Sequence, residues 1–387
     1  MTHSIKQKRI AIVGGGPGGL TLARLLQLGG ATVRVYERDL NKDVRVQGAT
    51  LDLHIESGLE ALRRAGLTEA FYQHYRPEAG KMRILDKHAE IRLDAHDEEG
   101  FDEQRPEIDR GPLRKILLAS LEPDTVVWDS QFVSMSEQNG TWTLLFKNGT
   151  TAEADLVIAA DGANSKIRPY ISAVKPVYSG VTIVEGTIPH AERNAPHLYK
   201  LVNGGKIFAF GDEQTLILST KGDGSLCFYT GCKVDELWVQ NSGIDFTDKQ
   251  QVHNWFKEQF GTWAAVWQEL FSGNELSVIP RPQYHFPLDQ SWESLPSVTM
   301  LGDAAHRMPP YAGEGVNMAM QDAFELSECL LNERFTDTLG AISYYEKQML
   351  LRASAITRVT LDSTEMMHSD DPINQMIRMF EGHEGQA

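Results

Sequence analysis

The stretch that decides the fold of this chain is IAIVGGGPGG, residues 10–19. Its apolar first half predicts a buried strand, and Gly14, Gly16 and Gly19 have the GxGxxG spacing of a dinucleotide-binding turn. The first glycine permits a tight turn, the second lets the backbone approach a pyrophosphate, and the third lets a helix pack closely on the strand. Pro17 suits the first turn of that helix, whose N-terminal N–H groups attract phosphate.

The segment VRVYE, residues 33–37, predicts a second strand that ends in an acidic residue. Glu37 follows Gly14 by 23 residues, which is where an acid takes the ribose hydroxyls of a bound dinucleotide. In this context an ordinary strand–helix turn is the weaker reading. The motif does not distinguish NAD from FAD.

Composition narrows the class of protein. The chain has 387 residues and a formal net charge of −16, which argues against a nucleic-acid or anionic-membrane partner. No apolar run reaches membrane-spanning length, and residues 1–8 do not resemble a signal peptide. The three cysteines form no CxxC pair, and no metal site is expected. We expect a cytoplasmic protein.

Secondary-structure patterns predict two interleaved lobes. Alternating strands and helices at both ends of the sequence indicate an α/β lobe of Rossmann type, and turn-rich short strands between residues 181 and 231 indicate a second lobe built on an antiparallel sheet. We expect an FAD-binding domain at 1–74, 101–171 and 280–322, a substrate domain at 75–100 and 172–279, and a bridging helical segment at 323–387. The predicted helices are 18–29, 57–65, 112–121, 248–258 and 316–332, with strands at 32–37, 125–129, 142–147, 156–160 and 297–301. Residues 336–379 are predicted to form a long C-terminal helix broken near 370–372. Asn148-Gly149 is predicted as the turn between strands 142–147 and 156–160.

Two later segments distinguish the cofactors. DLVIAADGANS, residues 155–165, is a strand that ends in Asp161-Gly162, and LGDAAH, residues 301–306, is a strand that ends in Gly302-Asp303. With the glycine fingerprint, they make the chain resemble the aromatic-hydroxylase group of single-component FAD monooxygenases. This resemblance implies FAD as cofactor, NADPH or NADH as a transient reductant, and no catalytic side chain of the protein's own. His306 is expected to support the turn, and Ser165 to cap a helix.

The resemblance also assigns residues to the cofactor. It implies that Asp303 contacts the ribityl chain, that Asp161-Gly162 serves FAD and the passing nicotinamide, and that Arg45 and Arg114 meet the flavin and its phosphates. Arginine suits such positions because its guanidinium binds two anionic oxygens at once. The full predicted cofactor set is Gly14, Gly16, Pro17, Gly19, Glu37, Arg38, Arg45, Asp52, Arg114, Asp161, Gly162, Gly302, Asp303, Pro310, Gly313, Gly315, Val316 and Asn317.

Within this group the chain is most similar to the flavin monooxygenases that inactivate tetracyclines. The likeness includes GATLDLH at 48–54, PEIDR at 106–110 and PPYAGEGVN at 309–317, where Glu314 replaces the glutamine of many relatives. In the substrate lobe it implies that Lys200 and Cys227 replace a glutamine and a histidine that hold tetracycline. The full predicted substrate set is Lys200, Cys227, Tyr229, Pro310, Tyr311, Gly313, Asp362 and Met366.

The implied reaction is hydroxylation of a polycyclic phenol or enol through a C4a-hydroperoxyflavin, with tetracycline as the first substrate to test and O2 as the oxidant. Another aromatic or polyketide substrate remains open. So do a flavin-dependent halogenase or reductase and a non-catalytic protein that sequesters such a compound. No Trp-x-Trp-x-Ile-Pro halogenase motif occurs, and Trp263 and Trp267 are predicted to share one helical face. A monomer is expected.

Overall fold

The computed structural model describes residues 5–44, 48–95, 105–271, 273 and 276–384. Its nucleotide-binding end is a five-stranded parallel sheet in the order β17-β11-β1-β2-β7. The strands are β1 (Ile10–Val13), β2 (Val33–Tyr36), β7 (Val126–Val127), β11 (Leu156–Ala159) and β17 (Val298–Met300). β1 and β11 are buried along their whole length, which explains their continuous runs of apolar residues.

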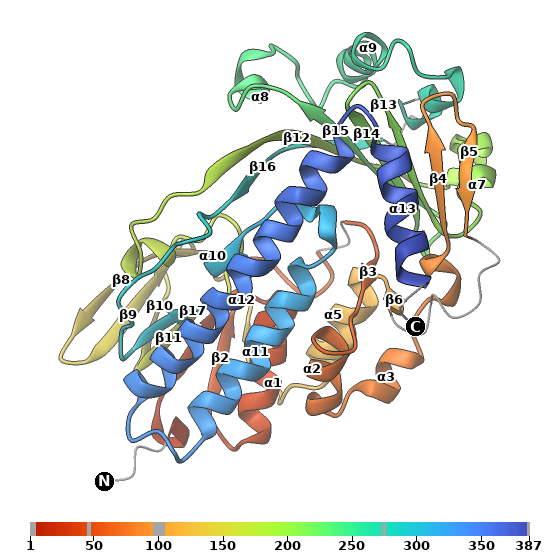
Figure 1. Cartoon of the computed structure of the whole chain (residues 1–387). Helices are drawn as coiled ribbons and strands as arrows, with labels where there is room; N and C mark the ends of the chain where they lie inside the picture. The colour runs from red at the N-terminus through yellow and green to blue at the C-terminus, as the bar shows by residue number, and fades with distance from the viewer. Residues whose placement is uncertain (1–4, 45–47, 96–104, 272, 274–275, 385–387) are drawn as a thin grey trace.

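Helices cover this parallel sheet. α1 (Pro17–Leu28) packs against α11 (Gly315–Leu331), with α2 (Gly58–Ala65), α3 (Thr68–Tyr72) and α5 (Arg110–Ala119) beside them (Figure 1). The short β3 (Leu51–Asp52) and β6 (Glu107–Ile108) pair antiparallel next to these helices. α1 is buried over the consecutive residues 18–23 and at Leu25 and Leu26, so it is enclosed on more than one side. The prediction of a Rossmann-type α/β lobe is therefore confirmed.

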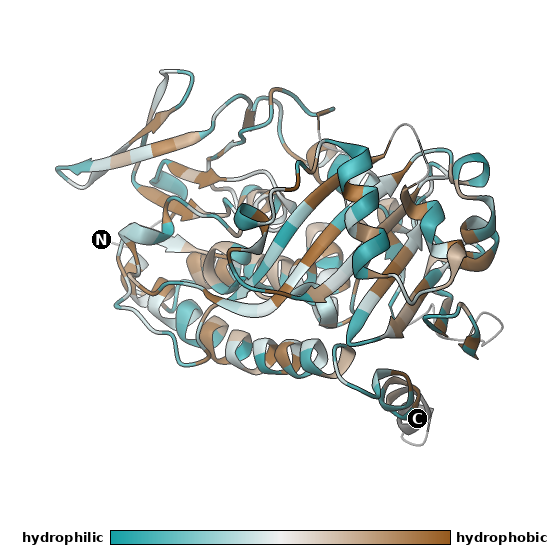
Figure 2. Cartoon of the chain, turned by 90° about the horizontal axis from the view of Figure 1, so that it is seen from above, coloured by the Kyte–Doolittle hydropathy of each residue, from teal (hydrophilic) through white to brown (hydrophobic). Residues whose placement is uncertain are grey.

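A seven-stranded sheet forms the other end of the molecule, in the order β16-β12-β15-β14-β13-β4-β5. Its strands are antiparallel except for the pair β13–β4. They are β4 (Met82–Asp86), β5 (Ile91–Asp94), β12 (Val177–Ile188), β13 (Lys206–Gly211), β14 (Gln214–Thr220), β15 (Leu226–Lys233) and β16 (Ser277–His285). In Figure 2, hydrophobic and hydrophilic stretches alternate along these strands.

The two faces of this sheet pack against different elements. One face carries Leu216, Leu226 and Phe228 and packs against α7 (Pro196–Val202), α9 (Lys249–Gln259) and the 3-10 helix η4 (Ala265–Phe271). We call this the outer face. The other, inner face carries Ile183 and Phe210 and packs against Tyr311, Met367 and Met376. Because side chains alternate along a strand, each residue of β15 is assigned to one face or the other.

The C-terminal segment connects the two ends. α12 (Thr338–Met367) runs from the parallel sheet to the larger sheet, and α13 (Pro372–Glu384) lies beside β4 (Figure 1). The predicted helical tail and its break are therefore present, as two helices. No helix among the described residues has both the length and the apolar character needed to cross a membrane.

Two local predictions were wrong. Asn148-Gly149 does not lead into the strand at 156; it joins β9 (Thr141–Phe146) to β10 (Thr151–Ala154), and with β8 (Phe132–Gln138) these form a separate antiparallel sheet. The alternating exposure of β10 was too weak a hydrophobic signal to predict a strand. Trp263 precedes η4, and only Trp267 lies within it, although their rings still meet edge to face at 5.9 Å.

Candidate functional site

The glycine turn has the geometry that a pyrophosphate needs. Gly14 has φ of +113°, and a Cβ at Gly19 would come within 2.2 Å of the Gly14 carbonyl oxygen, so the helix packs tightly on the turn. A Cβ at Gly16 would meet no protein atom within 4 Å. The space in front of Gly16 is therefore open at the N-terminus of α1, where an anion is favoured.

The predicted ribose-binding acid already has partners within the protein. The Glu37 side chain is only 2% exposed, and its Oε2 accepts a 2.5 Å hydrogen bond from the Gly15 amide. Its Oε1 accepts from the Asp39 amide at 3.0 Å. The Glu37 carboxylate thus holds the backbone of the glycine turn in place, a role that the motif spacing alone did not predict. The adjacent Arg38 is exposed.

Two buried polar groups near this turn have unused hydrogen-bonding atoms. Arg114 on α5 is 8% exposed and donates from one guanidinium nitrogen to Asp39 at 2.9 Å, while its Nε and its other terminal nitrogen have no partner in the described structure. The Asp161 Oδ2 accepts from the Lys166 amide at 2.8 Å, whereas its buried Oδ1 has no hydrogen-bond partner among the described residues. Unpaired buried polar atoms are costly, so these atoms indicate a polar ligand such as FAD.

Asp303, predicted to contact the ribityl chain, begins α10 (Asp303–His306). Its side chain is accessible to solvent, and it faces Gly315, where a Cβ would lie 4.0 Å from Oδ1. Desolvation by the surrounding protein raises the pKa of Asp303, and the charges of His306 and Arg307 oppose this. A carboxylate in this position can accept hydrogen bonds from a sugar-like chain. The residues present therefore fit FAD.

The loop from Pro309 to Glu314 brings the cofactor residues close to the larger sheet. Asp52 lies beside Gly313, since a Cβ there would be 3.3 Å from the Asp52 Oδ1. The Asn317 side chain is fully engaged within the protein: its Oδ1 accepts from the His54 amide, and its Nδ2 donates to the Asp52 carbonyl, each at 2.9 Å. Asn317 can thus reach FAD only through its backbone. Pro310, Gly313, Gly315 and Val316 are accessible at least in part.

The structure brings four of the predicted substrate residues together on the inner face. Tyr229 and Met366 pack into the cluster that contains Tyr311, and Cys227 shares the face of Tyr229 by strand alternation. The Tyr229 hydroxyl accepts a hydrogen bond from the Ala49 amide at 3.2 Å. Burial, together with the charge of Glu185, raises the pKa of Cys227 to about 11, so this side chain is a neutral thiol.

Three other predicted residues lie elsewhere. Lys200 is exposed on α7, whose Leu198 and Val202 pack on the outer face, so this lysine is not near Tyr229. Asp362 is exposed on α12. Arg45 lies outside the described residues. The resemblance implied a role for Lys200 from its place in the sequence, but the packing of α7 decides which face of the sheet this helix covers.

Two contacts were not predicted from the sequence. His368, fully buried at the end of α12, lies 3.4 Å from the Tyr311 hydroxyl through Nε2, and its Nδ1 is 2.8 Å from the Thr364 carbonyl. Burial lowers the pKa of His368 to about 4, so it is neutral at pH 7 and donates from Nδ1 to that carbonyl. The Tyr311 hydroxyl is therefore anchored between the loop and the helix.

Ser165 and His306 make contacts within the protein. The Ser165 hydroxyl accepts a hydrogen bond from the Arg168 amide at 3.0 Å, and the His306 side chain pairs with the Asp322 carboxylate at 2.5 Å.

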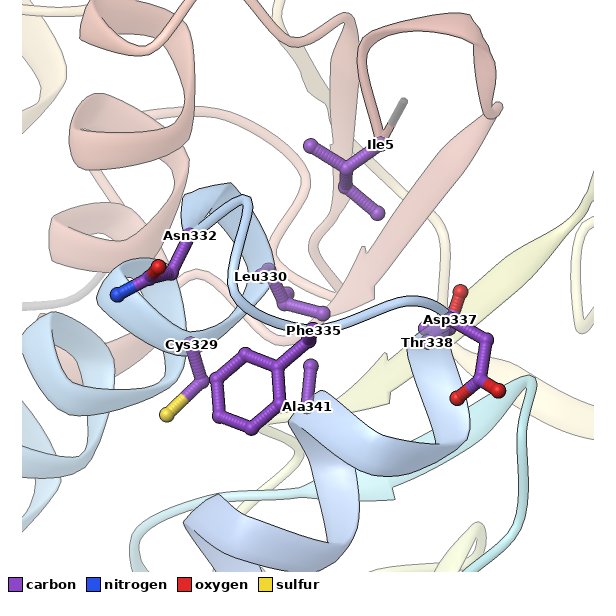
Figure 3. A pocket seen from close by; sticks show the side chains of 8 residues that line it. All are labelled: Ile5, Cys329, Leu330, Asn332, Phe335, Asp337, Thr338 and Ala341. Atoms are coloured by element: carbon purple, nitrogen blue, oxygen red, sulfur yellow. The ribbon is translucent and has the colours of Figure 1, made fainter. Parts of the chain in front are cut away.

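Two hollows lie away from these residues. One, of about 10 Å³, lies at the end of α11 around Cys329 and Phe335 and can hold no more than one water molecule (Figure 3). The other, of about 380 Å³, lies between residues 288–294 and α12. Neither is lined by any residue predicted to bind FAD or substrate.

Arg114 gives a direct test of the cofactor site. Replacing it with lysine should weaken FAD binding by about 10–100-fold, because the donors of an ammonium lie on a single nitrogen, which cannot pair with Asp39 and also replace the separate Nε and second terminal nitrogen of Arg114. The measurement is quenching of FAD fluorescence on titration of the apoprotein. Lys115→Arg, on the next residue and exposed, is the control and should leave FAD affinity unchanged. Equal affinities for Arg114→Lys and the wild type would exclude Arg114 from the site.

Comparison with known proteins agrees with this geometry. A family model described as an FAD binding domain matches residues 7–261 and 291–360. Monooxygenase penA of Penicillium thymicola is 27% identical over 96% of this chain and 98% of its own length. The 6-hydroxynicotinate 3-monooxygenase of Pseudomonas fluorescens is 29% identical over 94% of this chain and 93% of its own length. The crystal structure of tetracycline destructase Tet(55) has the same fold, with a TM-score of 0.74 at 20% identity, covering 94% of this chain and 90% of that one.

Proposed function

The chain belongs to the FAD binding domain family, and from this premise we propose that it hydroxylates a polycyclic phenol or enol, with tetracycline as the first candidate. It is an FAD-dependent monooxygenase of the aromatic-hydroxylase type. NADPH or NADH is the proposed reductant and O2 the oxidant. FAD, when bound, supplies the redox and oxygen chemistry, and the protein supplies binding, orientation and exclusion of water.

The observation that supports this proposal is the inner face of the larger sheet, which lies opposite the cofactor loop. Phe208, Ile217 and Tyr229 give it an apolar and aromatic surface, which Met366 and Tyr311 border. A flat polycyclic ring system would bury apolar area there, and few polar groups would be needed to orient it.

We propose that fewer polar side chains hold the substrate in this protein than the resemblance to tetracycline-inactivating enzymes implied. Cys227 is a buried neutral thiol and a weak hydrogen-bonding partner, and Lys200 lies on α7 at the outer face. Among the described polar side chains at this face, Glu185 pairs with Arg281, and His368 is held between Tyr311 and the Thr364 carbonyl. Tyr229 and the backbone of the 309–314 loop are further polar groups there. We therefore propose that ring shape and apolar contact select the substrate. The hydroxylated position is set by how the ring lies against Tyr311.

Mass spectrometry of the products tests the proposed function. Purified protein with FAD, NADPH and tetracycline should give a product heavier by one oxygen atom, with NADPH consumption stimulated by the drug. A panel of phenols, hydroxylated pyridines and polyketides serves as the comparison set. Unchanged tetracycline together with turnover of another panel member would reject the drug and keep the hydroxylase. Absence of stimulation by any compound would favour sequestration, and a halide-dependent chlorinated product would favour a halogenase.

A further inference from the structure

The larger of the two hollows is lined by none of the residues predicted to bind FAD or substrate. It has a volume of about 380 Å³ and lies between residues 288–294 and α12. Pockets for small organic molecules have volumes of roughly 300–1,000 Å³. Leu288, Trp292 and Leu350 give the hollow an apolar lining, and the last two also pack against the core of the nucleotide-binding end. A small molecule with an apolar part therefore fits here.

A buried carboxylate forms part of the wall. Glu346 on α12 lines the hollow and is only 2% exposed. Its Oε1 accepts a hydrogen bond from the Thr299 hydroxyl at 2.8 Å, and its Oε2 accepts one from the Ser294 hydroxyl at 2.5 Å. Because Thr299 lies in β17 and is 0% exposed, the carboxylate is fixed in place. A carboxylate has about four acceptor positions, so two hydroxyl groups leave it able to accept further hydrogen bonds.

Glu346 differs from other buried carboxylates of this chain because it lacks a cationic partner among the described residues. Asp322 pairs with Arg352, and Glu107 pairs with Lys206. Burial raises the pKa of Glu346, and only hydrogen bonds oppose this. A buried charge without a partner is costly. A ligand that brings a cation would remove this cost.

Trp292 places an aromatic ring beside this carboxylate. Its Nε1 is buried and has no hydrogen-bond partner in the part of the chain that the structure describes, but it lies near enough to Glu346 to lower the pKa of that carboxyl group. The Arg168 guanidinium lies 5.4 Å from the centroid of the Trp292 ring, and aromatic faces attract cations. A protonated amine in the hollow would thus be near both an anion and an aromatic ring, and each of these stabilises a cation.

The other charged groups of the lining offset one another. Asp289 and Lys347 both line the hollow, and both are exposed. Their formal charges are opposite, so Glu346 leaves the lining with a net negative charge. The lining therefore favours a ligand with one positive charge and an apolar body.

Gln290 holds the 288–294 segment in place. Its Oε1 accepts a hydrogen bond from the Arg168 guanidinium at 2.7 Å, and its Nε2 donates one to the Ala305 carbonyl at 3.1 Å. This wall of the hollow is thus formed before any ligand binds, and a preformed site loses less conformational entropy on binding.

We propose that this hollow binds a small organic amine, with its ammonium group beside Glu346 and its apolar body against Trp292 and Leu350. The interaction is reversible and forms no covalent bond. Because the hollow shares no residue with the predicted FAD and substrate sites, this inference does not depend on the proposed function.

Isothermal titration calorimetry of the FAD-loaded protein tests this inference. The probes are phenethylamine and hexylamine, and their neutral counterparts are phenethyl alcohol and hexanol. We expect at least one amine to bind with a Kd of about 1 mM or below, and about 10-fold or more tightly than its alcohol, because only the amine brings a charge to Glu346.

Glu346→Gln is the variant that removes the charge. The amide keeps the shape of the side chain and can still bond to the Ser294 and Thr299 hydroxyls. Amine affinity should fall by about 10–100-fold, while alcohol affinity stays the same. Glu365→Gln is the matched control, because Glu365 is an exposed residue of the same helix that does not line the hollow. It should bind the amine as the wild type does, and urea unfolding checks that both variants are folded.

Tryptophan indole NMR signals locate the ligand. The chain has 7 tryptophans, and the Trp292 signal is identified by its loss in Trp292→Phe. Added amine should shift this signal in the wild type and in Glu365→Gln. Ser343→Phe, which places a ring in the hollow without changing Glu346, should abolish both the shift and the binding.

The outcomes are distinct. Amine binding that is lost in Glu346→Gln and in Ser343→Phe but kept in Glu365→Gln would support the site. Equal amine affinity in the wild type, Glu346→Gln and Ser343→Phe would place the amine elsewhere and overturn the inference. Failure of both amines to bind the wild type, or equal affinity for amine and alcohol, would also overturn it.

Discussion

Replacement of Gly14 with alanine is expected to abolish FAD binding and to destabilise the protein. The new Cβ would lie 2.1 Å from the Ala160 carbonyl oxygen, a backbone atom that cannot move cheaply, and φ of +113° is strained for any residue with a Cβ. Together these effects should lower the free energy of unfolding by about 2–5 kcal/mol. Urea unfolding of the apoprotein measures the loss of stability, and absorbance of the purified protein at the flavin bands measures retained FAD.

Gly16→Ala is the matched variant, and it should separate stability from binding. Its Cβ meets no protein atom within 4 Å and its φ is −77°, so the apoprotein should unfold as the wild type does. FAD affinity should nevertheless fall by about 10–100-fold, because the methyl group occupies space that a pyrophosphate needs. An unchanged FAD affinity in Gly16→Ala would show that the cofactor does not approach this turn.

Removal of the Asp322 carboxylate should lower the stability of the protein strongly, although Asp322 is not one of the residues predicted to bind FAD or substrate. Asp322 is 0% exposed and accepts from the Gly302 amide at 2.8 Å and from Arg352 at 2.7 Å, and it pairs with His306 at 2.5 Å. Asp322→Ala removes the buried acceptor of the Gly302 amide, the partner of His306, and one of the two carboxylates that pair with Arg352. We expect a loss of about 3–5 kcal/mol in urea unfolding, with weaker FAD binding because Gly302 is released.

The pH dependence of this loss has a definite sign. Burial raises the pKa of Asp322, but the charge and hydrogen bond of His306 and the charge of Arg352 outweigh it, so the pKa lies below its ordinary value. The stabilisation is therefore fully present above about pH 4 and is lost only as pH falls through the lowered pKa. Glu325→Gln, which breaks only a partly exposed pair with Arg352, is the control and should cost less than about 1 kcal/mol. Equal losses for both variants would contradict the role given to Asp322.

The sequence was sufficient to predict that the protein binds FAD and that it contains a parallel sheet. Glycine spacing and an unbroken apolar strand act locally, because the tight turn and the helix N-terminus are made by residues that are neighbours in the chain. The same holds for Gly302, whose φ of +60° belongs to its own turn. The break near residue 371 was also local, because Pro372 begins α13 and cannot continue the helix before it.

Other features required the folded chain. Lys200 falls on the outer face because α7 packs there through Leu198 and Val202, and no residue near Lys200 in sequence specifies which face of the sheet a helix covers. Of the β8–β10 sheet only β9 was predicted, as the strand at 142–147; β8 and β10 were missed because they are half exposed, and a half-exposed strand gives a weak pattern.

What the sequence determined by itself was a dinucleotide fingerprint and, through two further motifs, an FAD monooxygenase fold. What only the tertiary structure decided was which atoms are left unpaired and which charges meet. Glu37 serves the Gly15 amide, Asn317 joins residues 52 and 54, and His54 lies between carboxylates from strand β3 and a loop 262 residues later in sequence. The physical reason is that hydrogen bonds and ion pairs act over a few ångströms in space, whatever the separation along the chain.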